Sequence, residues 1–215
     1  MATISSAAGI FVFAFLLGLS GAMMPGPMTF ATIDRATRYG VRTGPLVTLG
    51  HGIPEVLITV GLIFGLGRVL AMHSVAGTIG VLGAVVLIWM GCGMIKDARS
   101  GRLSLDPKGG GISSVGPFAA GILTTLTNPY WFVWWGTVGA FYVLQTWKQG
   151  LFILASFFIG HIMADLFWMT LMAFAGVTGR RFLSDKFYRG LVITLGFFLI
   201  GMAGYFLYSG IRFLV

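Results

Sequence analysis

Apolar runs of about twenty residues follow one another along almost the whole chain, with short polar breaks between them. The hydrocarbon core of a bilayer is about 30 Å thick and needs about 20 apolar residues per helix. A transmembrane barrel is excluded because the runs lack the strict alternation of lipid-facing and lumen-facing residues. The sequence therefore predicts an all-α polytopic membrane protein with six spans, at residues 7–33, 44–66, 75–95, 115–145, 150–176 and 190–211.

Composition supports this prediction. Of the 215 residues, 57% are hydrophobic and only 9% are charged, which leaves no room for a separate soluble domain. The first 20 residues contain no Lys or Arg, whereas a secretory signal begins with a positively charged segment, so we expect a retained first span. The single cysteine, Cys92, excludes an intramolecular disulfide and paired-thiol chemistry.

The basic residues are distributed unequally between the two sides of a six-span chain. Eleven fall in the segments after spans 1, 3 and 5, and three fall on the opposite side. Basic residues in short loops stay in the cytoplasm, so both termini are expected outside a cytoplasmic (inner) membrane. The net charge of +8 is then an orientation signal, and we expect no nucleic-acid partner. The eleven are Arg35, Arg38, Arg42, Lys96, Arg99, Arg102, Lys108, Arg180, Arg181, Lys186 and Arg189; the three are Arg68, Lys148 and Arg212.

Two segments of the chain repeat the pattern Gly-His-x-x-x-acid, at residues 50–55 and 160–165. A proline break precedes each of them in the preceding span. An odd number of spans per half inverts the second copy relative to the first, as in many secondary transporters. We therefore predict a single transporter domain of two inverted three-helix repeats, residues 1–99 and 115–215, joined by a cytoplasmic loop at residues 100–114. Chance similarity in a glycine-rich apolar chain is the alternative.

The two breaks are candidate substrate-binding segments. Proline removes a backbone donor and obstructs the preceding turn, and glycine widens the accessible dihedrals, so the helices should be interrupted here. Freed amides at the start of a half-helix suit an anionic group such as a carboxylate. The alternative is that the prolines only kink the helices and that Thr124, Thr125 and Thr127 bond back to their own helix. The candidate residues are Pro25, Gly26, Pro27, Thr127, Asn128 and Pro129.

Four ionisable residues lie at membrane depth: His51, Glu55, His161 and Asp165. Each histidine stands four residues before its acid, on the same helix face. Such groups are costly in a bilayer and are usually buried, paired and tied to ion or proton movement. One hypothesis is proton coupling, with a buried carboxylate exchanging a proton and a histidine relaying it. A second is a divalent metal bound by all four side chains. A third is a purely structural polar clamp.

The tryptophans of the fourth span and the acid beside Arg35 each allow two interpretations. Trp131, Trp134 and Trp135 fall on one side of the fourth span, and packing is favoured over the lining of a substrate cavity. Asp34 beside Arg35 is most simply an interfacial charge pair, with a gate role as the alternative. Glycines in the second and third spans, such as Gly77, Gly80 and Gly83, predict close helix packing.

The ordered motifs resemble the LysE/RhtB family of amino-acid exporters over nearly the whole chain. The first half of that family is matched by residues 25–27 (Pro-Gly-Pro), by residues 38–44 (Arg-Tyr-Gly-Val-Arg-Thr-Gly), and by Gly50-His51 with Glu55. Residues 126–129 (Leu-Thr-Asn-Pro) resemble its second signature. The resemblance implies efflux of amino acids or their derivatives, driven by the proton gradient across a bacterial or archaeal cytoplasmic membrane. Related families of the same superfamily export metal cations, which maintains the metal hypothesis.

These observations predict a secondary-active exporter that works by alternating access, in which one half rocks against the other. Its partners are a small-molecule substrate and the lipid bilayer, and a homodimer is compatible with the sequence. We expect no cofactor and no enzymatic activity. An intramembrane hydrolase that uses the same histidines is the alternative, but the sequence contains no recognised zincin motif.

Overall fold

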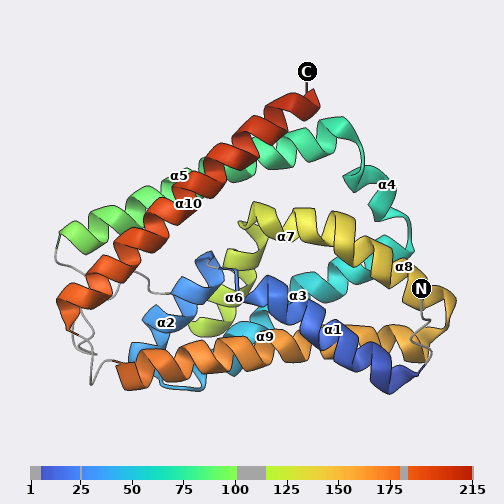
Figure 1. The fold of residues 1–215 in the computed structure, drawn as a ribbon, viewed down its shortest axis with the longest axis horizontal. Coiled ribbons are helices and arrows are strands. Elements are labelled where there is room, and N and C mark those ends of the chain that lie inside the picture. Colours follow the sequence, from blue (N-terminus) through green and yellow to red (C-terminus); the bar gives the residue numbers. More distant parts are fainter. Residues whose placement is uncertain (1–5, 25, 101–114, 180–183, 215) are drawn as a thin grey trace.

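The computed structural model describes residues 6–24, 26–100, 115–179 and 184–214. Within these ranges every regular element is a helix and no strand occurs, so the all-α prediction is confirmed (Figure 1). The elements are α1 (Ala7–Ala22), α2 (Pro27–Tyr39), α3 (Thr43–Ile63), α4 (Leu66–Leu70), α5 (His73–Arg99), α6 (Pro117–Leu126), α7 (Pro129–Trp134), the π-helix η1 (Trp135–Gly139), α8 (Ala140–Lys148), α9 (Leu151–Gly179) and α10 (Asp185–Leu214).

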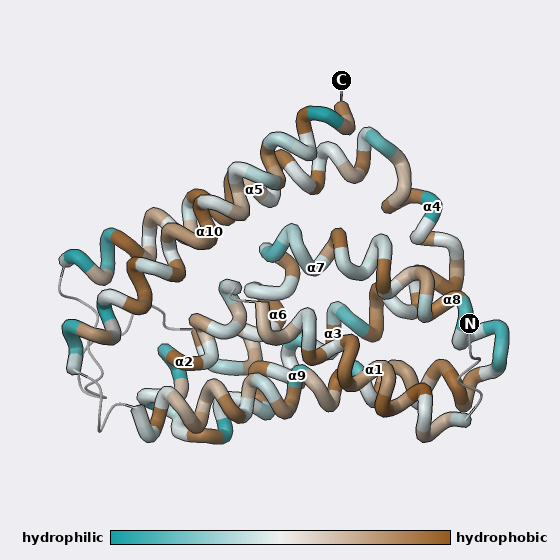
Figure 2. Tube along the Cα trace, in the orientation of Figure 1, coloured by the Kyte–Doolittle hydropathy of each residue, from teal (hydrophilic) through white to brown (hydrophobic). Residues whose placement is uncertain are grey.

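By length and composition, four of the described helices could each cross a membrane: α3, α5, α9 and α10. The pair α1 and α2 adds a fifth candidate if it is counted as one broken span. Figure 2 shows hydrophobic residues along the lengths of these helices and hydrophilic segments near several of their ends. The structure therefore supports four to five spans, and the predicted count of six is not confirmed.

The fourth predicted span, residues 115–145, is not one helix. It is divided among α6, α7, η1 and α8. The break between α6 and α7 follows from two side chains: Asn128 caps α7 by accepting a hydrogen bond from the Tyr130 amide, and Pro129 has no amide hydrogen with which to continue α6. Helices α7, η1 and α8 then follow one another without a gap. The short pieces do not reach the length of a span on their own.

The interruption expected in the first span is present. Helices α1 and α2 meet at an angle of 82° across a break of a few residues. The Met23 amide closes the last turn of α1 on the Leu19 carbonyl, and α2 begins at Pro27, whose fixed dihedral suits a first helical turn. Gly40 then ends α2 at a φ of 72°, in the left-handed region that favours glycine. Pro25 lies outside the described residues.

The helices pack in three long pairs: α1 along α9, α3 along α6, and α5 along α10. In Figure 1 the α5–α10 pair crosses one side of the molecule as a separate layer. Glycines allow the close approaches, because any side chain at Gly50 would overlap the Phe118 carbonyl and one at Gly160 would overlap the Phe11 carbonyl. In the α5–α10 pair, Gly80 faces Gly210 in the same way.

Candidate functional site

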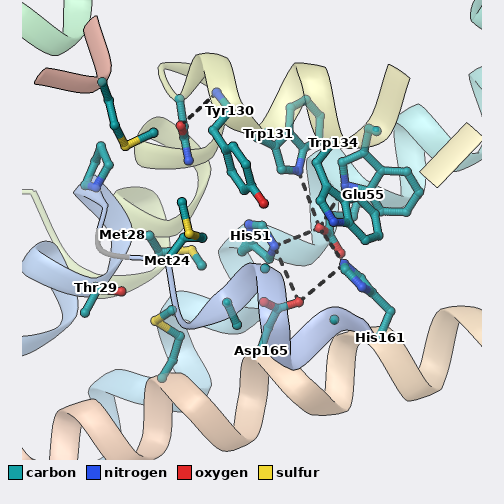
Figure 3. A pocket seen from close by; sticks show the side chains of 18 of the residues that line it. Met24, Met28, Thr29, His51, Glu55, Tyr130, Trp131, Trp134, His161 and Asp165 are labelled. Carbon is teal, nitrogen blue, oxygen red and sulfur yellow. Dashed lines mark hydrogen bonds and ion pairs between the residues drawn. The ribbon is translucent and has the colours of Figure 1, made fainter. Parts of the chain in front are cut away.

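The four predicted ionisable residues meet between α3 and α9, near the middle of both helices (Figure 3). All four are buried, with between 1% and 5% of each residue exposed. The Nε2 atom of His51 lies 2.8 Å from Glu55 Oε1 and 3.7 Å from Asp165 Oδ2. The Nε2 atom of His161 lies 3.2 Å and 3.6 Å from the same two oxygens. Imidazoles and carboxylates therefore alternate around a ring of four side chains, to which each Gly-His-x-x-x-acid segment contributes one histidine and one acid.

Glu55 is the most heavily coordinated member of this ring. Its Oε1 atom also accepts hydrogen bonds from the indole nitrogens of Trp135, at 3.1 Å, and Trp131, at 3.4 Å. The Trp134 ring stacks on His161, with centroids 4.7 Å apart. Two indole N–H groups and two imidazole nitrogens thus converge on one carboxylate oxygen, an arrangement that suits a full negative charge. The tryptophans, for which packing was the favoured interpretation, contact the ring directly.

Thr125 contacts His51 from α6. The Thr125 hydroxyl oxygen lies 2.7 Å from the Gly121 carbonyl and 2.6 Å from His51 Nδ1, and its single proton can be donated to only one of them. If the hydroxyl donates to Gly121, it accepts from His51 Nδ1–H, and the 2.8 Å contact between His51 Nε2 and Glu55 Oε1 then needs a further proton or another cation. If the hydroxyl donates to Nδ1, the Nε2–H group of a neutral His51 donates to Glu55.

Several polar atoms of the ring remain without a hydrogen bond. Among the described residues, Glu55 Oε2, His161 Nδ1 and Asp165 Oδ2 are buried and make no hydrogen bond. Helix α1 approaches His161 closely at Gly18, where a side-chain carbon would stand only 2.8 Å from Nδ1, and glycine offers this nitrogen no side-chain partner. Buried unpaired polar atoms are costly and indicate a place where water, an ion or a solute group binds. They border a central cavity of about 80 Å³.

The break residues differ in whether they reach this cavity. Pro27, at the start of α2, lines it, whereas Gly26 precedes α2 as its N-terminal cap and does not. In the second half Asn128 lines it through the turn that begins α7. Pro129 is buried but points away, against Gly83 of α5. The Thr127 hydroxyl donates to the Leu123 carbonyl of its own helix, as the alternative interpretation of the threonines anticipated.

Sequence reasoning missed part of the cavity wall. Met24 and Met28 line it beside the first break, and Leu87, Leu199 and Met202 close it from the α5–α10 pair. No local motif marks these residues, because their proximity depends on how α5 and α10 cross the other helices. The two indole donors were detectable in principle, since Trp131 and Trp135 are spaced by four residues.

We expect Thr125→Val to destabilise the protein by about 1–3 kcal/mol, because it leaves the buried Nδ1 atom of His51 without its hydrogen-bond partner. Thr125→Ser should retain wild-type stability. Unfolding midpoints in detergent micelles measure the effect. The matched control is Thr194→Val, at an exposed position where the hydroxyl only bonds back to Gly190. Equal midpoints for the valine and serine variants at position 125 would contradict the assigned hydrogen bond.

Comparisons with known proteins agree with this architecture. Residues 19–210 match the family model described as LysE type translocator. The chain is 28% identical over 204 residues to the "Putative amino acid efflux protein YcgF" of Bacillus subtilis, covering 94% of this chain and 97% of that one. It is 29% identical over 198 residues to the "Chemotactic transduction protein ChpE" of Pseudomonas aeruginosa, covering 91% and 96%. No solved structure matches the chain significantly.

Proposed function

Because the chain belongs to the LysE type translocator family, we propose that it is a proton-coupled secondary exporter of amino acids or related small solutes. The family and the apolar helices make it a multi-pass membrane protein of a transporter class. The Bacillus subtilis relative is named as a "Putative amino acid efflux protein", which supports the proposal that the exported solute is an amino acid.

The observation that carries the coupling proposal is the contact between His51 and Glu55. A contact of 2.8 Å between an imidazole nitrogen and a carboxylate oxygen is a hydrogen bond that holds a proton between the two groups, and exchange of that proton would change the charge of the ring. The ring lies at the depth where a charged group is costly unless it is paired. In the proposed cycle, uptake of a proton on one side and its release on the other accompany the switch between two access states.

The inverted repeat is part of the same proposal. It counts α1–α2 as one broken span and α6 to α8 as another, which restores six. The crosswise packing of α1 on α9 and of α3 on α6 supports it, because exchanging the two halves exchanges these pairs. Gly50 and Gly160, each directly before the ring histidine, make equivalent backbone contacts. Rocking of one half against the other gives alternating access.

Orientation and substrate residues complete the proposal. The excess of basic residues after the first, third and fifth spans supports a cytoplasmic location for those ends, with both termini outside the inner membrane. The breaks at Gly26–Pro27 and Thr127–Pro129 are proposed to guide the solute past the ring. The position of these breaks supports this role, because Pro27 and Asn128 line the same cavity as the ring residues.

A direct test uses proteoliposomes loaded with a panel of labelled amino acids. An inwardly directed proton gradient should accelerate efflux of at least one of them several-fold, and a protonophore should remove the acceleration. Empty liposomes and liposomes at equal internal and external pH are the controls. Efflux that proceeds at one rate whatever the gradient would refute proton coupling, although export itself would stand.

A divalent metal as the cargo is the second candidate. His51, Glu55 and Asp165 offer ligand atoms that all lie within 4.8 Å of one another. Ligands of a tetrahedral ion at about 2.1 Å lie about 3.4 Å apart, close to three of the four ring distances. The His51–Thr125 hydrogen bond also resembles the outer-shell contact of metal-bound histidines. The indole N–H groups that already occupy the Glu55 oxygen argue against a metal at this position. Elemental analysis after dialysis against Zn²⁺ or Mn²⁺ distinguishes the two candidate functions. Metal export requires that an ion binds in stoichiometric amount and that His51→Ala abolishes this binding.

A further inference from the structure

Two cavities of very different size meet at the start of α2, and Pro27 lines both. The central cavity beside the ring has a volume of about 80 Å³, which is room for a few water molecules or an ion. The second cavity is a half-open pocket of about 620 Å³ between α2, α5 and α6. Pockets for small organic ligands span about 300–1,000 Å³. Of these two adjoining cavities, only the second therefore has room for a solute in this conformation.

The second cavity contains charged groups of both signs. Arg35, with 8% of the residue exposed, donates from Nε to the Val115 carbonyl at 3.0 Å and from Nη1 to the Ala31 carbonyl at 3.3 Å. Asp34 Oδ2 lies 3.9 Å from Arg35 Nη1, which is longer than a hydrogen bond, so neither group saturates the other. Within the described part of the chain, the Asp97 carboxylate on α5 makes no hydrogen bond or ion pair.

The hydroxyl groups of the cavity add acceptors. Thr124 donates its hydroxyl proton to the Ala120 carbonyl, and Thr127 donates its own to the Leu123 carbonyl. Both oxygens keep lone pairs that can accept further hydrogen bonds. Together with two carboxylates they suit an ammonium group, and the Arg35 guanidinium suits a carboxylate. The polar groups thus match a zwitterion.

The rest of the wall is apolar. Phe30 comes from α2, Trp89 and Met94 come from α5, and Leu123 comes from α6. A charged solute side chain placed against this wall would lose its hydration without gaining a partner, whereas a large apolar one would be stabilised by burial. We infer that this cavity, given the proposed export function, is the recognition site for α-amino acids with large apolar side chains.

Its place in the fold agrees with export. The cavity extends to the last turns of α5, close to Lys96 and Arg99, at the end proposed to be cytoplasmic. A solute that leaves the cell enters from that side. It meets the large cavity first and the ring afterwards, with the Pro27 turn between them.

Binding to the purified protein in lipid nanodiscs tests the assignment, with L-phenylalanine, L-leucine, L-alanine, L-lysine and L-glutamate as probes. Phenylalanine and leucine should bind at least about tenfold more tightly than the other three, because burial of a large apolar side chain exceeds the energy of a tenfold change. Phenethylamine lacks the carboxylate and 3-phenylpropionate lacks the ammonium group. Each should bind at least about tenfold more weakly than phenylalanine, because a buried partner is left unpaired.

Variants locate the site. Trp89→Ala and Asp97→Asn should each weaken phenylalanine binding at least about tenfold. Trp147→Ala, an exposed tryptophan on α8, and Lys96→Gln, the charged neighbour of Asp97 outside the cavity lining, are the matched controls and should leave it unchanged. Unchanged phenylalanine binding in both test variants would overturn the assignment, as would tightest binding of lysine or glutamate, and in either case amino-acid export would stand. If none of the panel binds and proteoliposomes exchange no amino acid, the export proposal fails, and this inference fails with it.

Discussion

Glu55→Gln should reduce solute efflux at least about 100-fold, the largest functional effect expected of any single substitution in this chain. Glutamine has nearly the shape of glutamate but carries no charge. Two indole N–H groups and two imidazole nitrogens converge on Glu55 Oε1, and the neutral amide cannot exchange a proton with His51 as a carboxylate can. Initial efflux rates from proteoliposomes under a fixed proton gradient measure the loss.

A folded but inactive variant is the expected outcome, so stability must be followed in parallel. Breaking a buried ion pair from one side costs about 3–5 kcal/mol, which lowers the unfolding midpoint of Glu55→Gln. Asp165→Asn separates the two effects, because Asp165 Oδ2 lies 3.6–3.7 Å from both imidazoles and makes no hydrogen bond in the described structure. It should lose proton-driven efflux while its midpoint falls less than that of Glu55→Gln, because its contacts with the two imidazoles are longer than those of Glu55. Asp185→Asn, at the start of α10, is the control for removal of an acid outside the ring. Full proton-driven efflux in both ring variants would refute the coupling role.

The largest structural effect is expected from Gly121→Val. Any side chain at this position would overlap the Val47 carbonyl oxygen, and its Cβ would stand 2.9 Å from the His51 amide nitrogen. Helix α6 would have to move away from α3 and take the Thr125 hydroxyl away from His51. Overpacking of this kind costs about 3 kcal/mol. The expected result is a strongly reduced yield of folded protein after detergent extraction.

The matched control for that substitution is Gly93→Ala on α5. No atom lies within 4 Å of a side-chain carbon built there, and alanine is the better helix former. We expect unchanged or slightly raised stability, by up to about 1 kcal/mol. If Gly121→Val unfolded at the same denaturant concentration as Gly93→Ala, the close packing of α3 on α6 would be wrong.

The sequence was sufficient to predict that the two Gly-His-x-x-x-acid segments meet. A histidine and an acid four residues apart share a helix face, and burial of such groups in a bilayer leaves each pair little to contact except the other. Their role in coupling stays a prediction. The sequence was not sufficient to predict that Glu55 Oε1, rather than Asp165, receives the indole donors. That choice depends on how α7 and η1, which carry Trp131 and Trp135, are placed against α3, and no local motif specifies this placement.

The larger cavity was equally inaccessible to sequence reasoning. Asp34 and Asp97 stand 63 positions apart on different helices, with no repeated pattern to connect them. Asp34 was interpreted as one half of an interfacial pair with Arg35, and the pair exists, but Arg35 is buried and both residues line a cavity. The proline breaks were read correctly as interruptions, whereas the crossing of α5 over α2 and α6 required coordinates.

Because α3 and α9 each contribute two residues to the ring, the ring cannot form until both helices have been synthesised. During translation α3 is synthesised long before α9, so His51 and Glu55 enter the bilayer without His161 and Asp165. In a truncated chain that ends before α9, His51 and Glu55 never gain these partners, and their burial in hydrocarbon costs several kcal/mol. We therefore expect such a fragment to be less stable in the bilayer than the complete chain, because α9 supplies the partners of its buried ionisable groups.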